Sequence, residues 1–171
     1  MKPRIFISST YYDLKHIRAD IKNFIDNYGF DSVVFESGDV TFEHNKPLDA
    51  SCYQEVEACH MMILIIGGRY GSLASNNTYK EQEYEDTYIS ITRREFETAR
   101  SKNMHIFVFI DKDVYAEYHT YKKNKDFLLN NQSFNFAHVD SINVFRFIES
   151  LSNIAIKSFE KASEITEYLK L

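Results

Sequence analysis

The sequence predicts an α/β fold of three layers, with a parallel sheet of about five strands covered by helices on both faces. Three observations support this prediction. Short apolar runs alternate with segments of helical spacing along the chain. Two of those runs, 61–66 and 105–110, are apolar throughout, as strands buried on both faces are. The chain has 171 residues, which fits a single domain spanning 1–171.

The first part of the chain alternates strand, helix and strand. Residues 4–8 are a β-branched and aromatic run that predicts a buried strand. Apolar positions then recur at helical spacing over 12–28, with Gly29 as the stop signal. Residues 32–35 predict a second strand. After the polar stretch 36–46, Pro47 indicates the start of a helix whose apolar side carries Leu48, Cys52, Val56 and Cys59.

The same alternation continues to the end of the chain. A third strand, 61–66, leaves through a glycine-rich segment into a polar loop that reaches about residue 88. The elements that we expect after this loop are a helix at 92–102, a strand at 105–110, helices near 115–130 and 141–151, a strand around 155–159 and a helix at 162–169.

Composition and charge exclude several classes of protein. Apolar residues make up 44% and charged residues 26% of the chain, the balance of a soluble globular protein. The net charge of −5 provides no basic field for DNA or an anionic membrane, so neither is an expected partner. The longest apolar run, 61–66, is far shorter than the roughly 20 residues that cross a bilayer.

The cysteines and the N-terminus favour a cytoplasmic protein. Cys52 and Cys59 are two helical turns apart on an apolar face, which predicts core positions rather than a disulfide or a thiol nucleophile. His60 points elsewhere on the helix, and the other histidines are scattered, so we assign no metal. Lys2-Pro3-Arg4 leads directly into a strand-like run instead of a secretory signal.

A sheet wound in the flavodoxin manner binds ligands at the carboxyl ends of its strands, near the point where the strand order reverses. Three segments are predicted to meet at that edge: Ser8–Asp13 after the first strand, Gly67–Ser72 after the third, and the loop leading to Glu95. We expect any function to lie there.

The segment Ser8–Asp13 places hydroxyl groups next to the free N–H groups of a helix start. Such a segment can hold phosphate or ribose oxygens, and ordinary helix capping by Ser9 or Thr10 is an equally good interpretation. Gly67–Ser72 lacks the lysine of a P-loop and does not match the dinucleotide fingerprint. Its glycines allow close backbone approach, and Arg69 can pair with a phosphate or with a structural carboxylate.

Glu95 is the candidate for chemistry. It lies beside the apolar stripe of Phe96 and Ala99 in the helix before the fourth strand. A carboxylate there can bind ribose hydroxyls and stabilise the positive charge that develops as an N-glycosidic bond breaks. From spacing alone the structural alternatives are favoured, namely an acid in the first helical turn or a partner of Arg93 or Arg94.

Three segments together resemble one family. They are Arg4-Ile-Phe-Ile-Ser-Ser-Thr-Tyr-Tyr-Asp-Leu, Ile65-Ile-Gly-Gly-Arg-Tyr-Gly-Ser and Ser90-Ile-Thr-Arg-Arg-Glu-Phe-Glu-Thr-Ala99. In this order they are similar to a TIR-like domain family of unknown function. Its members open with a "FISST" strand, and they occur before NACHT-type and other STAND signalling ATPases or alone in prokaryotes. The resemblance is strongest over 3–111 and looser in the C-terminal third.

The resemblance implies a TIR-like sheet, distantly similar also to nucleoside deoxyribosyltransferases. It makes Glu95 the counterpart of the glutamate with which catalytic TIR domains cleave the nicotinamide–ribose bond of NAD. It places Ser8, Ser9 and Asp13 at the nucleotide pocket. In the mechanism that we then expect, the Ser8–Thr10 loop and Arg69 position the phosphates. Further candidate binding residues are Tyr70, Ser90 and Thr92.

Three functions remain open at this stage. The first is an NAD or nucleotide N-glycosidase of an antiphage signalling system, with NAD as candidate substrate and no tightly bound cofactor. The second is a non-catalytic module that self-associates or binds a partner signalling protein. The third is a deoxyribosyltransferase-like enzyme in which Glu95 forms a covalent adduct.

Overall fold

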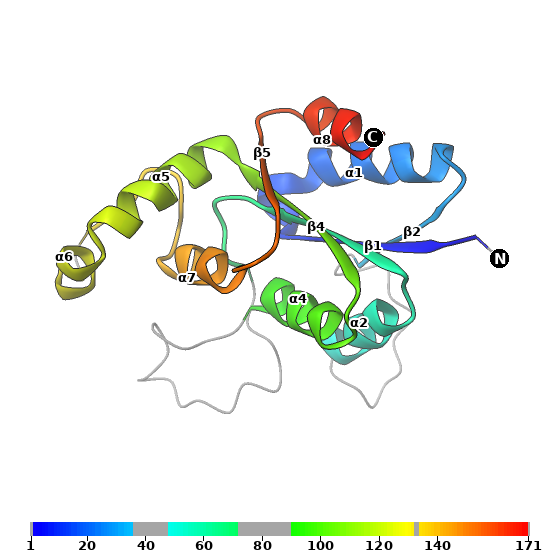
Figure 1. Cartoon of the computed structure of the whole chain (residues 1–171), viewed down its shortest axis with the longest axis horizontal. Coiled ribbons are helices and arrows are strands. Elements are labelled where there is room, and N and C mark those ends of the chain that lie inside the picture. The colour runs from blue at the N-terminus through cyan, green and yellow to red at the C-terminus, as the bar shows by residue number, and fades with distance from the viewer. Residues whose placement is uncertain (1, 36–47, 72–89, 132–133, 171) are drawn as a thin grey trace.

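The computed structural model describes residues 2–35, 48–71, 90–131 and 134–170. Its centre is a sheet of five parallel strands in the order β2-β1-β3-β4-β5 (Figure 1), which confirms the predicted fold class. The strands are β1 (Arg4–Ser9), β2 (Asp31–Val34), β3 (Met61–Ile66), β4 (His105–Asp111) and β5 (Ile156–Phe159). The helices are α1 (Tyr11–Asn27), α2 (Leu48–Glu57), α4 (Ile91–Ser101), α5 (Lys112–Lys123), α6 (Lys125–Asn130), α7 (Asn143–Ser150) and α8 (Ala162–Leu169).

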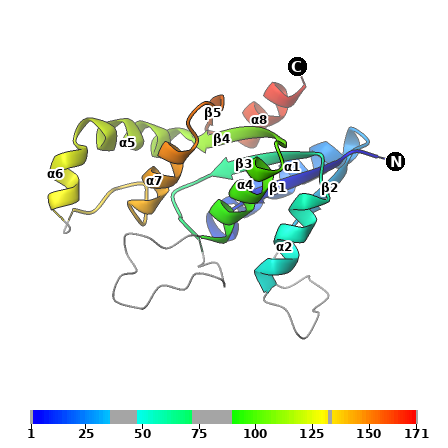
Figure 2. The same ribbon diagram turned by 60° about the horizontal axis from the view of Figure 1, so that its bottom comes forward.

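Helices cover both faces of the sheet. Helices α1 and α8 lie together on one face, whereas α2 and α4 lie side by side on the other (Figures 1 and 2). Alternate residues of β1 supply the two cores: Ile5 and Ile7 pack toward α1 and α8, while Phe6 packs on the side of α2 and α4. The side chain of Ser8 shares the side of Phe6, because it lies two residues further along the strand.

One predicted helix is two helices. The polar segment near 115–130 was expected to be continuous, but α5 ends at Lys123 and α6 begins at Lys125. Between them Asn124 has φ −119° and ψ 20°, outside the helical region, and its side-chain amide donates to the Thr120 carbonyl at 2.9 Å. The other predicted helices and strands are observed, with ends within one or two residues, except that α2 ends at Glu57. Cys59 and His60, which were expected on this helix, therefore lie beyond its end.

The strand order places two loops together. Strand β1 has β2 on one side and β3 on the other, so the order reverses between β1 and β3. The loops that follow these two strands leave at the same edge of the sheet, which is where ligands bind in open α/β sheets. The predicted polar stretch 36–46, the Pro47 helix start and most of the loop reaching residue 88 lie outside the described residues. Among the described helices, none combines the length and apolarity needed to cross a membrane.

Candidate functional site

Glu95 is held on α4 with its carboxylate directed into the protein. The Ser90 hydroxyl caps this helix by accepting a hydrogen bond from the Arg93 backbone N–H at 3.2 Å. Glu95 lies beyond the first turn, next to the buried side chains of Phe96 and Ala99, and only 5% of it is exposed. The same face of the helix that fills the core therefore carries the carboxylate.

The partners of the Glu95 carboxylate come from three other elements. The Ser8 hydroxyl at the end of β1 donates to its Oε2 at 2.5 Å. The thiol of Cys52 on α2 donates a second hydrogen bond, and the guanidinium of Arg18 on α1 acts on the carboxylate by its charge. Arg18 is itself buried and donates to the Phe35 carbonyl at 2.9 Å. We call Ser8, Arg18, Cys52 and Glu95 the Glu95 cluster.

Burial is the main influence on the pKa of Glu95. Removal from water raises the pKa of Glu95 to about 7, while the Ser8 and Cys52 hydrogen bonds and the charge of Arg18 act in the opposite direction. A carboxyl with such a pKa exchanges its proton readily near neutral pH. The cluster can therefore present either a negative charge or a proton at the strand ends.

The structural alternatives considered for Glu95 from the sequence are wrong. No acidic residue lies in the first turn of α4. Arg93 pairs instead with Glu97, four residues along the helix, at 3.4 Å. The carboxylate of Glu95 points to the opposite, buried side, and its partners Ser8, Cys52 and Arg18 belong to β1, α2 and α1.

Asp13 joins the two loops at the strand ends. Its Oδ1 accepts from the Thr10 hydroxyl at 2.5 Å, and its Oδ2 accepts from the Arg69 backbone N–H at 3.2 Å. A Cβ on Gly67 would overlap with the same carboxylate, so a larger residue there would turn the Asp13 side chain away from its present position. Thr10 is the N-cap residue of α1, but its side chain makes no capping bond, and Ser9 donates only to the Thr10 carbonyl. The prediction that the side chain of Ser9 or Thr10 caps α1 is therefore wrong.

Asp140 holds the other side of the Gly67–Gly71 loop. Its Oδ1 accepts from the Tyr70 backbone N–H at 3.0 Å, and its own backbone N–H donates to the Gly68 carbonyl at 2.9 Å. A Cβ on Gly68 would overlap with the His138 carbonyl oxygen. Two aspartates from distant parts of the chain therefore fix this loop from opposite sides.

A small hollow lies between these segments. Its volume is about 10 Å³, and four of the predicted binding residues contribute to its lining: Thr10, Arg69, Tyr70 and Thr92. Gly71, with φ +96°, lies against the side chains of Thr10, Thr92 and Ser90 at the same place. The hollow is where the predicted segments converge.

The sequence profile of a family described as domain of unknown function, DUF4062, matches residues 4–171. The chain belongs to the DUF4062 family. No curated protein sequence matches it.

Two solved structures resemble this DUF4062 chain over nearly its whole length. The TIR domains of the activated Roq1 resistosome, which directly recognises the pathogen effector XopQ, share 8% identity with a TM-score of 0.55, covering 99% of this chain and 98% of theirs. The Clostridium botulinum CMP N-glycosidase BcmB shares 15% identity with a TM-score of 0.47, covering 98% of each chain. The DUF4062 chain therefore has a TIR-like fold.

The predicted site residues fall into distinct environments in this DUF4062 structure. Ser8 and Glu95 are bonded to each other, and Thr10 and Asp13 are bonded at the loop junction. Tyr70 is a core side chain, 2% exposed. The side chain of Arg69 is exposed and forms no ion pair with any residue that the structure describes.

Two members of the Glu95 cluster were missed by sequence reasoning. Cys52 is buried, as predicted, but its thiol also bonds to Glu95. Arg18 lies on the buried stripe of α1, in register with Leu14, Ile21 and Ile25. A charged residue at a stripe position of an amphipathic helix is the signal that points to it.

Proposed function

We propose that this domain cleaves the N-glycosidic bond of NAD or a related nucleotide, by hydrolysis or cyclisation, with Glu95 as the catalytic carboxylate. One observation carries the proposal. The buried carboxylate of Glu95 on α4 accepts a hydrogen bond from Ser8 at the end of β1, and its pKa is about 7. A charge held in place away from water stabilises a developing cation more strongly than one in solvent.

In the proposed reaction the C1′–N bond breaks first, and its electron pair leaves with the base. Ionised Glu95 stabilises the positive charge that this leaves on the ribose and holds the ribose hydroxyls. In hydrolysis, water then attacks C1′, and its proton passes to a carboxylate or to solvent. In cyclisation, a nitrogen of the same nucleotide takes the place of water.

The residues around the hollow have supporting roles in this scheme. The exposed guanidinium of Arg69 pairs with the phosphates, and the Ser9 and Thr10 hydroxyls donate to them after releasing their present acceptors, the Thr10 carbonyl and Asp13. Thr92 lines the sugar side, while Ser90 holds α4 and Tyr70 holds the loop through their buried positions. Nucleotide-sized sites have volumes of roughly 300 Å³ or more, and Glu95 does not line the hollow, so the hollow has to open toward Glu95 before a nucleotide binds.

The test is turnover. Purified protein at high concentration, with a crowding agent, is incubated with NAD and a panel of nucleosides and nucleotides, and the products are separated by chromatography. Glu95→Gln keeps the shape of the side chain and should abolish turnover. Glu97→Gln, on the exposed side of the same helix, is the matched control and should retain it. Equal turnover in wild type and Glu95→Gln would refute the assignment of Glu95.

A second candidate is a non-catalytic module that self-associates or binds a partner signalling protein. One observation favours it: Glu95 is 5% exposed and already has partners inside the protein, as a purely structural carboxylate also does. In that case no substrate turns over at any concentration at which sedimentation detects oligomers. Substitutions on exposed helix faces, rather than Glu95→Gln, then abolish assembly. Either candidate is compatible with a role in prokaryotic immune signalling.

A further inference from the structure

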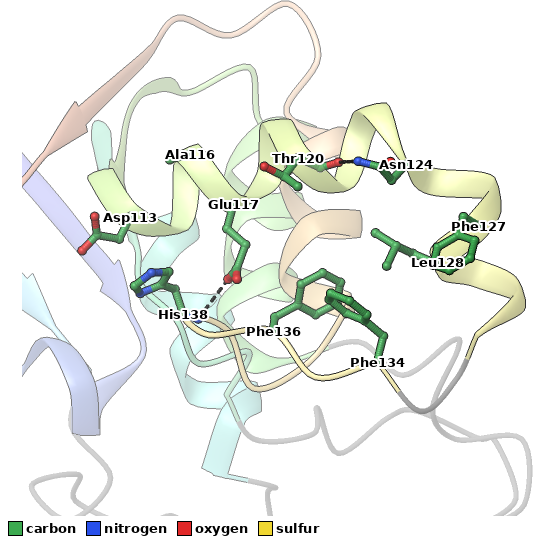
Figure 3. A pocket seen from close by; sticks show the side chains of 10 residues that line it. All are labelled: Asp113, Ala116, Glu117, Thr120, Asn124, Phe127, Leu128, Phe134, Phe136 and His138. Atoms are coloured by element: carbon green, nitrogen blue, oxygen red, sulfur yellow. Dashed lines mark hydrogen bonds between the residues drawn. The ribbon is translucent and has the colours of Figure 1, made fainter.

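A second cavity lies away from the Glu95 cluster. It has a volume of about 490 Å³ and runs along α5 toward α6, with the segment 134–138 as its opposite wall (Figure 3). No member of the Glu95 cluster lines it. Its volume falls within the range of small-molecule sites.

The wall opposite α5 is fastened by Glu117. The two oxygens of this carboxylate accept from the backbone N–H groups of Ala137 at 2.8 Å and His138 at 2.9 Å, one bond to each oxygen. Figure 3 shows the side chain of Glu117 reaching from α5 across to this segment. The cavity is therefore a space between elements that are tied together.

Aromatic rings form the far end of the cavity. Phe134 and Phe136 meet edge to face, with their ring centroids 5.0 Å apart, and Phe127 and Leu128 of α6 complete this end. Phe127 and Phe134 are 64% and 51% exposed, an unusual state for large apolar side chains. Their ring faces are available to a ligand, and such faces attract cations.

The carboxylates of Asp113 and Glu117 give the lining of the cavity a negative charge. Asp113 and Glu117 lie one turn apart on α5, and none of the ten described lining residues is a lysine or an arginine. Lys125, at the start of α6, is paired with Glu149 at 2.9 Å and does not line the cavity. The phosphate groups of a nucleotide would meet two carboxylates here, with no lysine or arginine among the described lining residues to offset them.

We propose that this cavity binds a small organic cation with an apolar or aromatic body. The cationic group lies beside Asp113 and Glu117 at the α5 end of the cavity, and the apolar or aromatic body packs against the phenylalanine rings at the α6 end. Charge complementarity and exposed ring faces both select this class of ligand. The proposal stands independently of any chemistry at Glu95.

The test uses benzyltrimethylammonium as the probe, with benzoate and benzyl alcohol as anionic and neutral comparators of similar shape. Each is titrated into the ¹⁵N-labelled full chain, and amide chemical shifts give both the affinity and the location. The cation should bind at least about tenfold more tightly than benzoate, with shifts concentrated in α5, α6 and 134–138. Equal binding of the cation and benzoate, or shifts elsewhere, would overturn the proposal.

Two variants separate charge from aromatic contact. Asp113→Asn and Phe134→Leu should each weaken cation binding by about three- to tenfold, and both residues are exposed enough to be replaced without loss of the fold. Asp20→Asn, at an exposed position of α1 on the other face of the sheet, is the matched charge control and should leave the affinity unchanged. Equal affinities in all four proteins would contradict the assigned location.

Discussion

The Ser8 hydroxyl and the Glu95 carboxylate lie 2.5 Å apart although 87 positions separate them in the chain. This bond joins the end of β1 to α4 beneath the loops of the candidate site. Because the acceptor is a buried acid with a pKa of about 7, the strength of the connection depends on pH. Both the stability of the domain and its proposed chemistry thus depend on one protonation equilibrium.

Replacing Glu95 by glutamine should flatten the pH dependence of stability. Burial raises the pKa of Glu95 from 4.5 to about 7, so at intermediate pH the folded protein keeps a proton that the unfolded chain has lost. The resulting stabilisation is complete below pH 4.5 and is lost as the pH rises through 7. At 1.36 kcal/mol per pKa unit it amounts to about 3 kcal/mol. Urea unfolding between pH 4.5 and 8 measures it.

The comparison of wild type with Glu95→Gln isolates this group. Asp26, whose pKa is lowered from 3.8 mainly by its hydrogen bond from Lys22, changes stability only at more acidic pH than this range and does so equally in both proteins. The wild type should lose stability relative to the variant across this range. Parallel curves would mean that the carboxyl titrates equally in the folded and unfolded states.

The Cys52 thiol should help to keep Glu95 ionised. Cys52→Ala removes a donor that stabilises the carboxylate, so the pKa of Glu95 should rise further, whereas Cys52→Ser keeps a donor and should shift it less. The signal of the Glu95 carboxyl carbon, assigned with Glu95→Gln, reports the titration directly. An unchanged titration midpoint of Glu95 in Cys52→Ala would show that the thiol does not stabilise the carboxylate.

The two aspartates that hold the Gly67–Gly71 loop should act on different amides. Asp13→Ala frees the Arg69 N–H, and Asp140→Ala frees the Tyr70 N–H. Each loss of about 1 kcal/mol corresponds to roughly fivefold faster hydrogen exchange at that amide. Exchange measured by NMR in both variants makes each the control of the other. Equal acceleration of both amides in either variant would show that the loop opens as one unit.

Gly68→Ala should destabilise the domain more than Gly29→Ala. The new Cβ at 68 overlaps with a backbone carbonyl of 138, a contact that side-chain rotation cannot relieve, and overpacking of this kind costs about 1–3 kcal/mol. Gly29 has φ +87° but open space around it, so alanine there costs about 1–2 kcal/mol through backbone strain alone. Urea midpoints compare the two. A smaller loss in Gly68→Ala would indicate that the segment 138–140 moves aside easily.

The sheet could be predicted from the sequence because two of its strands are apolar at every position. Residues 61–66 and 105–110 are too apolar to face water, and this excludes an open antiparallel sheet. The type of each element follows from local periodicity. The break at Asn124 could not be predicted in this way, because helical spacing continues on both sides of it. The backbone conformation of this one residue ends α5.

The partners of Glu95 were less accessible to sequence reasoning. Ser8 was placed at the correct edge by the strand-end rule, since its strand is short and well bounded. Arg18 and Cys52 reach the carboxylate from helices on opposite faces of the sheet. Which buried side chains meet there depends on helix rotation and sheet register, and neither is encoded by spacing within one segment.

The core between the sheet and α1 has a consequence for synthesis on the ribosome. It combines Ile5, Ile7, Leu14, Ile21 and Ile25 with Phe159 and Ile165 of β5 and α8. At ~5–20 residues per second, the early residues wait roughly 7 to 30 s before β5 and α8 have been translated. During that interval the amphipathic face of α1 lacks the part of its cover that these two elements supply.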